Sequence, residues 1–488
     1  MNMTNILVLG AGFGGIGAAL ELEKKLKNKE DYKITLIDRN NFHLFTPSLY
    51  EVATIYGLIE DNFAKYLRGS VSIPIGEIIE NKKINFVQAE IKEINLKEKF
   101  VLTNGETKLD FDYLIIALGG ETEFYGIPGV QEYAFNFKLV DDAIGVYRKI
   151  KDLYEKFRQP RSRSTKDRRN WGRQGAERQR FPASHGNLRR APSEGGGAPS
   201  EINIAVIGGG FTGVELAAEL GCCVSKIIDE YKLNKTCTQI FLFEAGPKIL
   251  PAINERARKI IEKRLTSEMV EIQTNSAVTE VGSDYIRIHP VKSALPKLNS
   301  SEYLTGRGGA AEQQFDGVKD RGELLNFDLI IWAGGVHGSR LLETLELKLT
   351  KKGTIEANEF LQTKNQDNSI NDKIFAIGDS VSFIDPKTQK PVPAMAYVTY
   401  DQADVAAENV VQSIKNQKLK PYNPFYDAWI APVGGKWAYF HYKSLNIAGF
   451  WGYCLRQSVD LRYFLKILPL NKAFSLFFKD LVIFTKND

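Results

Sequence analysis

Apolar runs that end in glycine or in an acid recur along the chain and predict buried strands. The first is Asn5–Gly10 (NILVLG), and an Ala/Leu/Glu/Lys-rich helical pattern follows it to about Lys29. A second run, KITLID, ends at Asp38. Strand, turn, helix and strand in this order form a βαβ unit, which implies a parallel sheet. Asn104–Gly105 then predicts a tight hairpin, and the apolar strand Tyr113–Leu118 follows.

The same pattern occurs a second time. Ile202–Gly210 (INIAVIGGG) is again an apolar run entering a glycine turn, a helical pattern comes after it, and TQIFLFE ends at Glu244. A later run, Phe327–Gly335 (FDLIIWAGG), echoes the run that ends in Gly119–Gly120. The sequence therefore predicts an internal duplication within an α/β fold: two Rossmann-like dinucleotide-binding domains plus a C-terminal region.

The predicted boundaries follow from this duplication. The first nucleotide domain is expected over residues 1–118 and 329–412, the second over 119–328, and the C-terminal region over 413–488. Residues 158–200 and 292–322 show no periodicity and read as exposed insertions. The first insertion explains the net charge of +5, because Arg158–Arg190 carries ten Arg and one Lys against two acids, or +9, and leaves −4 elsewhere. We expect a solvated insertion there and no nucleic-acid partner.

Composition limits the classes of protein further. Of 488 residues, 43% are hydrophobic and 25% are charged, which excludes global disorder. Four cysteines are too few for a disulfide framework in a chain of this length, so a reducing cytoplasm is expected. No apolar run approaches the roughly eighteen residues of a membrane-spanning helix, and the strand that starts near the N-terminus leaves no room for a signal peptide.

The first glycine turn fits the pattern G-x-G-x-x-G through Gly10, Gly12 and Gly15. The first glycine permits the tight turn, the second lets a pyrophosphate approach the backbone, and the third lets helix and strand pack closely. The pyrophosphate would lie at the positive end of the helix. Asp38, at the end of the second strand, is placed to accept hydrogen bonds from ribose hydroxyls.

The second turn fits again through Gly208, Gly210 and Gly213, with Glu244 in place of the acid. An acid at this position binds a 2′-hydroxyl and repels a 2′-phosphate, so the second site is expected to take NADH rather than NADPH. Two dinucleotide sites in one chain imply an electron relay. FAD, which stays bound, is expected in the first site, and the nicotinamide cofactor visits the second.

A third motif, IFAIGDS, places Gly378 and Asp379 after a short apolar strand. A carboxylate there could bind the ribityl chain or lie near the pyrophosphate. A helix predicted to begin near Ala394 could stabilise negative charge on the flavin ring with its N-terminus.

Together these motifs resemble the type II NADH dehydrogenases, single-chain FAD-containing NADH:quinone oxidoreductases. The resemblance rests on GAGFGGIGAA, DRNNFHLFTPSLYEVAT, VIGGGFTGVELAAEL, LFEAGPKILP, LIIWAGG and FAIGDS. It implies hydride transfer from NADH to FAD, then electron transfer to a membrane quinone without proton pumping. It also places Thr46 and Pro47 beside the flavin, and Glu215 near nicotinamide and flavin, where it could move protons to quinone. The FAD residues it implies are Gly10, Gly12, Phe13, Gly14, Gly15, Asp38, Arg39, Ala117, Gly119, Asp379 and Ala396; the NADH residues are Gly208, Gly210, Phe211, Thr212, Gly213, Glu215, Glu244, Ala333 and Gly334.

The C-terminal region is aromatic and basic from Tyr422 onward. Phe474, Phe477, Phe478 and Leu481 fall at helical spacing, which favours a helix lying in a membrane interface; a core or dimer-contact helix is the alternative. The resemblance implies peripheral attachment to the cytoplasmic face of the cell membrane through this region, and it allows a homodimer. We expect that residues after Asp460 can be deleted without loss of NADH-to-flavin reduction.

One stretch departs from the family. Where the family has Ala-Gln-x-Ala-x-Gln-Gln, this chain has Ala396–Gln402 (AYVTYDQ), of which only the first and last residues match. Tyr397 and Tyr400 could stack against a quinone ring or simply pack. The acceptor therefore stays open, and an NADH-sensing flavoprotein, or a related oxidoreductase with a non-quinone acceptor, is the alternative.

The cysteines and histidines narrow the remaining alternatives. Sulfide:quinone oxidoreductases and disulfide reductases need cysteines beside the flavin, whereas Cys222 and Cys223 lie in the second nucleotide helix and read as buried small residues. The histidines show no metal-ligand spacing, so no metal site is expected. For His43 a structural role is favoured over a catalytic one.

Overall fold

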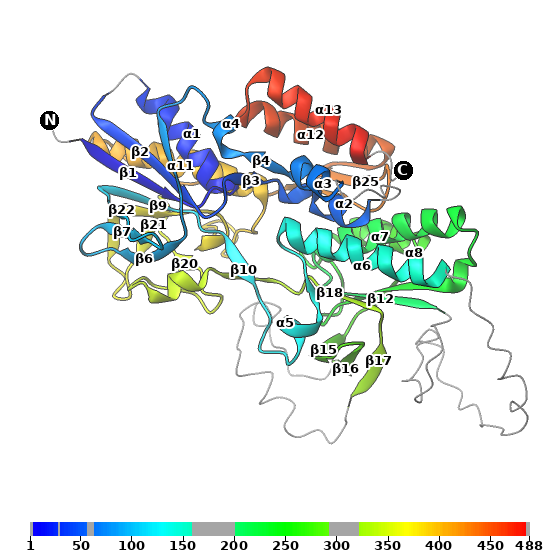
Figure 1. Ribbon diagram of the computed structural model, residues 1–488. Helices are drawn as coiled ribbons and strands as arrows, with labels where there is room; N and C mark the ends of the chain where they lie inside the picture. Colours follow the sequence, from blue (N-terminus) through cyan, green and yellow to red (C-terminus); the bar gives the residue numbers. More distant parts are fainter. Residues whose placement is uncertain (1–2, 28–29, 56–62, 159–200, 292–321, 485–488) are drawn as a thin grey trace, which may run out of the picture.

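The computed structural model describes residues 3–27, 30–55, 63–158, 201–291 and 322–484. Its first sheet has six strands in the order β21-β22-β9-β1-β2-β5, parallel except for β21 (Figure 1). Helices α1 (Phe13–Leu26) and α11 (Ala396–Ile414) cover one face and a small antiparallel sheet covers the other. The predicted βαβ unit and the hairpin at Asn104–Gly105 are therefore confirmed. The strands are β1 Thr4–Leu9, β2 Tyr32–Asp38, β5 Ile84–Gln88, β9 Tyr113–Ile116, β21 Gln362–Lys364 and β22 Ile370–Ala376, with β6 Ile91–Asn95, β7 Phe100–Thr103 and β8 Lys108–Asp110 in the small sheet.

The second sheet repeats this architecture. Five parallel strands run in the order β11-β18-β12-β13-β14, with helices on one face and a three-stranded antiparallel sheet on the other. The predicted duplication is thus confirmed at the level of layers. The strands are β11 Phe135–Asn136, β12 Ile202–Ile207, β13 Thr238–Phe243, β14 Val270–Gln273 and β18 Leu329–Trp332; the antiparallel sheet has β15 Ser276–Val281, β16 Tyr285–Pro290 and β17 Glu323–Asn326; the helices are α6 Val140–Arg158, α7 Phe211–Glu230 and α8 Glu255–Ser267.

One predicted boundary is wrong. A first-domain segment starting at residue 329 would include β18, but β18 pairs in parallel with β12 of the second sheet. It lies beside β12 as β9 lies beside β1, because both apolar strands fill the same place in duplicated sheets. The chain passes between the two sheets at the antiparallel pair β10 (Gly120–Thr122) and β19 (Val336–Gly338). The predicted insertions lie almost entirely outside the described residues.

The segment between β2 and β5 of the first sheet reaches across to the second nucleotide domain. It holds α2, in which every residue is buried and which packs against α6 and α7. This helix therefore brings residues of the HLFTPSLYEVAT motif up to the second nucleotide domain. The segment contains β3 Phe42–Leu44, η1 Thr46–Ser48, α2 Leu49–Thr54, α3 Phe63–Val71, β4 Ser72–Pro74 and α4 Ile75–Ile78; the short elements elsewhere are α5 Val130–Tyr133, η3 Lys235–Cys237, η4 Arg340–Thr344, β20 Ile355–Glu356, η5 Gly378–Ser380 and β23 Val381–Ser382.

The C-terminal region is an antiparallel sheet followed by two helices, and it is part of the core. Phe464, Ile467 and Ala473 are at most 2% exposed and lie in the same hydrophobic cluster as α1 and β1. A truncation after Asp460 would open that cluster, so the packing argues against our expectation that the truncated chain keeps its function. The elements are β24 Ala428–Pro432, β25 Ala438–Tyr442, β26 Leu445–Gly449, α12 Phe450–Ile467 and α13 Leu470–Phe484.

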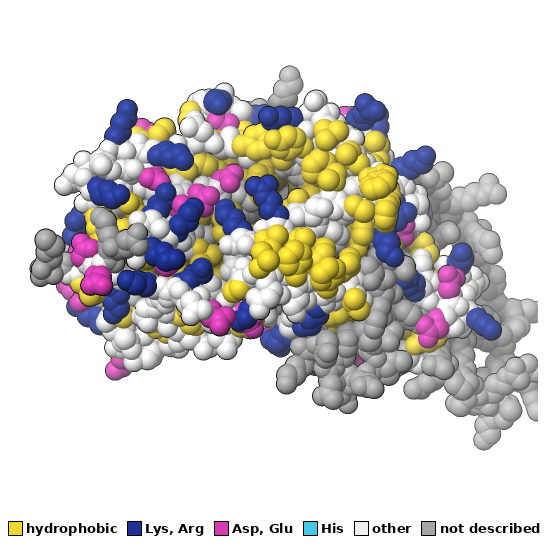
Figure 2. Space-filling model, turned by 90° about the horizontal axis from the view of Figure 1, so that it is seen from above, with side chains coloured by type: hydrophobic (Ala, Val, Ile, Leu, Met, Phe, Trp, Pro, Cys, Tyr) yellow, Lys and Arg dark blue, Asp and Glu magenta, His cyan; other side chains and the backbone are white. Residues whose placement is uncertain are grey.

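The outer face of α12 and α13 is apolar. Figure 2 looks onto this side and shows hydrophobic side chains gathered near its centre, with Lys and Arg around them. Of the four residues predicted for this face of α13, Phe474 and Phe478 are exposed, whereas Phe477 packs against the core and Leu481 is half-buried. Among the described residues no helix is long and apolar enough to cross a membrane. The exposed apolar residues of the two helices are Phe450, Trp451, Val459, Leu465, Leu470, Phe474, Phe478 and Val482.

Candidate active site

The first glycine loop joins β1 to α1 and has the shape of a pyrophosphate cradle. Gly10 has a φ of +93°, and a Cβ there would lie 2.3 Å from the carbonyl oxygen of Ala117. A Cβ at Gly15 would lie 1.7 Å from the Gly10 carbonyl oxygen, so this close helix–strand approach requires glycine. Around the Cβ position of Gly12 nothing lies within 4 Å, and α1 begins there without a side-chain cap. The start of the helix is therefore open to an anion.

The second loop, between β12 and α7, has the same geometry. Gly208 has a φ of +117°, and its Cβ would lie 2.3 Å from the Ala333 carbonyl oxygen. A Cβ at Gly213 would lie 1.9 Å from the Gly208 carbonyl oxygen, whereas Gly210 faces open space. Helix α7 also begins without a side-chain cap. Two equivalent cradles thus stand at the carboxyl ends of two parallel sheets, where such sheets bind nucleotides.

The two acids predicted to bind ribose lie against their own loops. An oxygen of Asp38 accepts a hydrogen bond from the backbone N–H of Ala11 at 2.7 Å. Glu244 accepts from the N–H of Gly209 at 2.7 Å and from that of Gly246 at 2.6 Å. Because each carboxylate oxygen can accept more than one hydrogen bond, both acids keep capacity for ribose hydroxyls.

The third motif meets the first loop. The N–H of Gly378 donates to Gln402 on α11 at 2.7 Å, and the Ser380 hydroxyl donates to the carbonyl oxygen of Gly119 at 3.2 Å. Asp379 lies between them, and Gly14 packs directly against α11. These contacts bring three segments predicted for FAD to one junction.

The other residues predicted from the sequence surround these loops. Helix α11 begins at Ala396, two residues beyond the predicted start. Phe13 is the first residue of α1, Arg39 is exposed just after β2, Phe211 and Thr212 open α7, and Ala333 and Gly334 follow β18.

His43 ties the C-terminal region to the first loop. Its ring is fully buried, with Nδ1 3.0 Å from the Ala11 carbonyl oxygen and Nε2 2.8 Å from the hydroxyl of Tyr463 on α12. Burial lowers the pKa of His43 to about 4, so the imidazole is neutral near pH 7. The ring also meets Phe13 edge-on, with centroids 4.9 Å apart. This geometry supports the structural role that the sequence favoured.

Thr46 and Pro47 open the turn η1, and a buried arginine of α12 holds that turn. A guanidinium N–H of Arg456 donates to the Ser48 hydroxyl at 3.1 Å and to the Pro47 carbonyl oxygen at 3.4 Å. The same guanidinium lies 3.2 Å from the carboxylate of Glu51. Sequence reasoning missed Arg456. The available signal was an Arg and an Asp four residues apart in a helix rich in apolar residues.

Glu215 lies in the first turns of α7, on the side that packs against α2. Burial raises the pKa of Glu215 to about 8, and the positive charge of Arg456 partly opposes this rise. Glu219, one turn later, is 5% exposed and accepts a hydrogen bond from the N–H of Gly435. With a pKa near neutrality, Glu215 can both hold and release a proton under physiological conditions. A small pocket beside it is lined by Tyr50, Glu51, Glu219, Pro432, Gly435, Tyr453 and Arg456.

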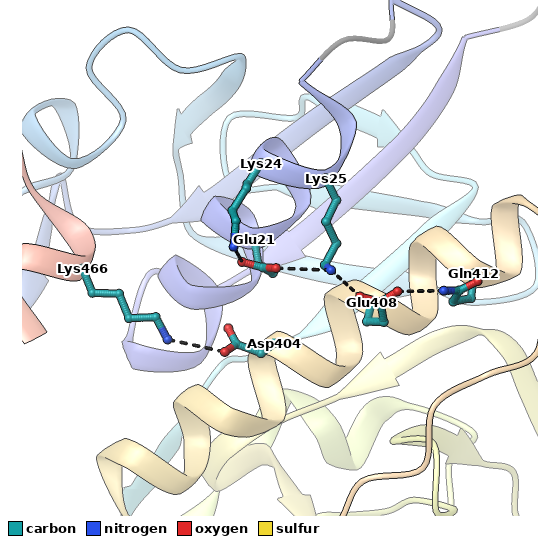
Figure 3. Close-up of polar contacts among 7 residues, drawn as sticks. All are labelled: Glu21, Lys24, Lys25, Asp404, Glu408, Gln412 and Lys466. Carbon is teal, nitrogen blue, oxygen red and sulfur yellow. Dashed lines mark hydrogen bonds and ion pairs between the residues drawn. The ribbon is translucent and has the colours of Figure 1, made fainter.

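The stretch Ala396–Gln402, which differs from the family pattern, contains two tyrosines with different surroundings. Tyr400 is 6% exposed and packs against Gly17 of α1, with the ammonium group of Lys466 3.5 Å from its ring centroid. Lys466 also pairs with Asp404, and the neighbouring ion pair of Lys25 with Glu408 joins α1 to α11 (Figure 3). Tyr400 therefore packs between helices. Tyr397 is only partly buried at the start of α11, and burial raises the pKa of its hydroxyl.

All four cysteines are free. Burial raises the pKa of Cys223 to about 12, and the pKa of Cys222, whose thiol donates to Glu268, is also raised. Both thiols are therefore protonated and poorly reactive at neutral pH. Cys223 is buried as expected, whereas Cys222 is only half-buried.

Two nucleotide cradles, each closed by an acid and carried on duplicated parallel sheets, define a two-dinucleotide-binding oxidoreductase. The chain belongs to the pyridine nucleotide-disulphide oxidoreductase family, whose model matches residues 4–408. The type II NADH:quinone oxidoreductase of Staphylococcus aureus is 27% identical over 469 residues, which cover 96% of this chain and 97% of that protein. The predicted resemblance is thus confirmed.

Solved structures show the same fold. NDH2 from Plasmodium falciparum in complex with NADH has a TM-score of 0.70 at 19% identity, covering 99% of this chain and 98% of that one. The sulfide:quinone oxidoreductase from Aquifex aeolicus has a TM-score of 0.66 at 17% identity, covering 95% and 90%. The predicted α/β dinucleotide-binding fold is confirmed.

Proposed function

We propose that this protein is an FAD-dependent NADH:quinone oxidoreductase. The observation that carries the proposal is the matched pair of glycine cradles, each with its acid held against the loop. Similarity over nearly the whole length to the Staphylococcus aureus enzyme also supports the proposal. The three FAD-side segments that meet at Gly14, Gly119 and Asp379 fit a flavin dinucleotide in the first site.

The residues of the chain bind and orient the two dinucleotides. The open helix starts at Gly12 and Gly210 receive the pyrophosphates, and Asp38 and Glu244 accept hydrogen bonds from ribose hydroxyls. The negative charge of Glu244 repels a 2′-phosphate, which favours NADH over NADPH. FAD supplies the chemistry that accepts hydride and passes electrons onward. Glu215 holds a proton near the site where nicotinamide and quinone react.

The quinone is proposed to reach the site from a membrane surface. The apolar face of α12 and α13 carries two residues more than two-thirds exposed, Trp451 and Leu470, with Lys and Arg at its edges. An amphipathic surface of this kind binds in the interface of a lipid bilayer. We therefore propose peripheral attachment at the cytoplasmic face; a homodimer stays a prediction.

A non-quinone acceptor is the second candidate. The stretch Ala396–Gln402 favours it, because Tyr397 and Asp401 stand where the family has glutamine. In addition, Tyr400 is packed between α1 and α12. An NADH sensor would take up one equivalent of NADH and then stop.

One experiment separates the two candidates. The purified protein is mixed anaerobically with NADH and then with a short-chain ubiquinone or menaquinone analogue, while flavin absorbance is followed. Bleaching by NADH and rapid return of colour with quinone are expected. Bleaching without return would favour the non-quinone acceptor, and absence of flavin after reconstitution would overturn both candidates.

A further inference from the structure

Acids, most of them buried, gather where α2, α7, α12 and α13 meet, and the proposed function uses only one of them. Arg456 lies at the centre of this cluster, is 5% exposed, and lies 3.2 Å from the carboxylates of both Glu51 and Asp460. We name this set the acid cluster. Its charged and titratable members are Tyr50 and Glu51 on α2, Glu215 and Glu219 on α7, Arg456 and Asp460 on α12, and Lys479 and Asp480 on α13.

The acid cluster cannot be fully ionised. One buried guanidinium compensates a limited number of carboxylates, and each further negative charge would be buried without a partner. Asp480 is 8% exposed, and its Oδ1 has no hydrogen-bond partner among the described residues. Burial, reinforced by the charge of Glu51, raises the pKa of Asp480 to about 9, while Lys479 opposes the rise. Asp480 therefore holds a proton at neutral pH.

The proposed reaction consumes one proton in each turnover. NADH and quinone give NAD⁺ and quinol only if one proton is added to the hydride and its two electrons. Asp480 lies on the buried side of α13, whose opposite side carries the exposed residues Phe478 and Val482. A proton held there is close to the surface from which a lipid-soluble quinone would enter.

We propose that Asp480 is the proton store for quinone reduction and passes its proton through the acid cluster to Glu215. This inference rests on the proposed function. In each turnover the O–H bond of the Asp480 carboxyl breaks, the proton moves by way of Glu51 to Glu215, and an O–H bond forms on the quinone. NADH supplies both electrons and, through its hydride, the hydrogen of the other quinol O–H bond; a proton from the bulk solvent then restores the Asp480 carboxyl. Arg456 is a positioning residue whose charge stabilises the carboxylates that form transiently.

The test compares Asp480→Asn with Glu77→Gln in the flavin-loaded protein. Asparagine has the shape of aspartic acid but cannot release a proton. The control residue Glu77 is a partly exposed acid on α4, and it lies 3.8 Å from Lys472, which is on α13 like Asp480. Rapid mixing measures two phases: reduction by NADH and reoxidation by a short-chain ubiquinone, between pH 6 and pH 10. A second measurement follows the reoxidation rate of the unaltered protein over the same range.

The expected result separates the two phases. Asp480→Asn should leave the NADH phase unchanged and slow reoxidation at least about ten-fold, whereas Glu77→Gln changes neither. In the unaltered protein, reoxidation should slow above about pH 9 as Asp480 loses its proton. Unchanged reoxidation in Asp480→Asn overturns the inference; if that variant does not fold, a flat profile of the unaltered protein up to pH 10 overturns it. Failure of the unaltered protein to reoxidise at all would contradict the proposed function instead.

Discussion

Replacing Glu215 by Gln tests whether this partly buried acid lowers the stability of the folded protein. In the unfolded chain this carboxyl has an ordinary pKa of 4.5, whereas burial raises the pKa in the folded protein to about 8. Between these values the unfolded chain loses the proton and the folded protein keeps it. The folded protein therefore loses stability as the pH rises from 4.5 to about 8, and above that the loss is complete. Glutamine cannot ionise and carries no such cost.

The magnitude follows from the two pKa values of Glu215. Each pH unit between them changes the free energy of unfolding by about 1.4 kcal/mol. The cost in the unaltered protein is then about 2 kcal/mol at pH 6 and about 4–5 kcal/mol at pH 9. The Glu215→Gln variant should therefore be the more stable protein, and its advantage should grow by about 2–3 kcal/mol between these pH values.

Urea unfolding at pH 6 and pH 9, with equal FAD concentrations, measures this advantage. Glu155→Gln is the control, because Glu155 is an exposed acid on the neighbouring helix α6 and its loss should leave the pH dependence unchanged. Arg456 keeps Glu51 and Asp460 as partners in the variant, so the substitution does not leave a cation unpaired. If the unaltered protein and Glu215→Gln differ by the same amount at both pH values, the reasoning about burial of Glu215 is wrong.

Three further predictions follow from the site and the surface. Gly15→Ala should destabilise the protein by about 1–3 kcal/mol and lower its flavin content, measured by absorbance, because a Cβ would overlap the Gly10 carbonyl; full flavin content would refute this. Glu244→Gln should raise the KM for NADH about ten-fold and narrow the preference over NADPH; an unaltered ratio of the two kcat/KM values would exclude its ribose role. Exchanging Phe478 and Val482 together for Glu should weaken binding to anionic vesicles at least about ten-fold with NADH-to-flavin reduction intact; sedimentation with vesicles at the original level would contradict the membrane face.

The sequence determined the repeated nucleotide folds because their signals are local. The requirement for glycine at Gly10 and Gly208 arises from the backbone conformation of a tight turn. Asp38 and Glu244 each stand at the end of the strand that follows the helix after that turn. Strand–turn–helix order then fixes a parallel sheet. The same local reasoning placed His43 in a structural role. It misassigned β18, because an apolar strand after a long insertion does not reveal which sheet it joins.

Only the tertiary structure decided how the C-terminal region packs and which charged groups it brings to the site. Helical periodicity indicated an apolar face around Phe474, but which neighbours α13 packs against, and hence the burial of Phe477, depends on residues hundreds of positions away. The acid cluster has the same origin: Glu51 and Arg456 are 405 residues apart and become partners only when α12 docks on α2. The pKa of a carboxyl depends on its burial and on neighbouring charges, and three-dimensional packing sets both.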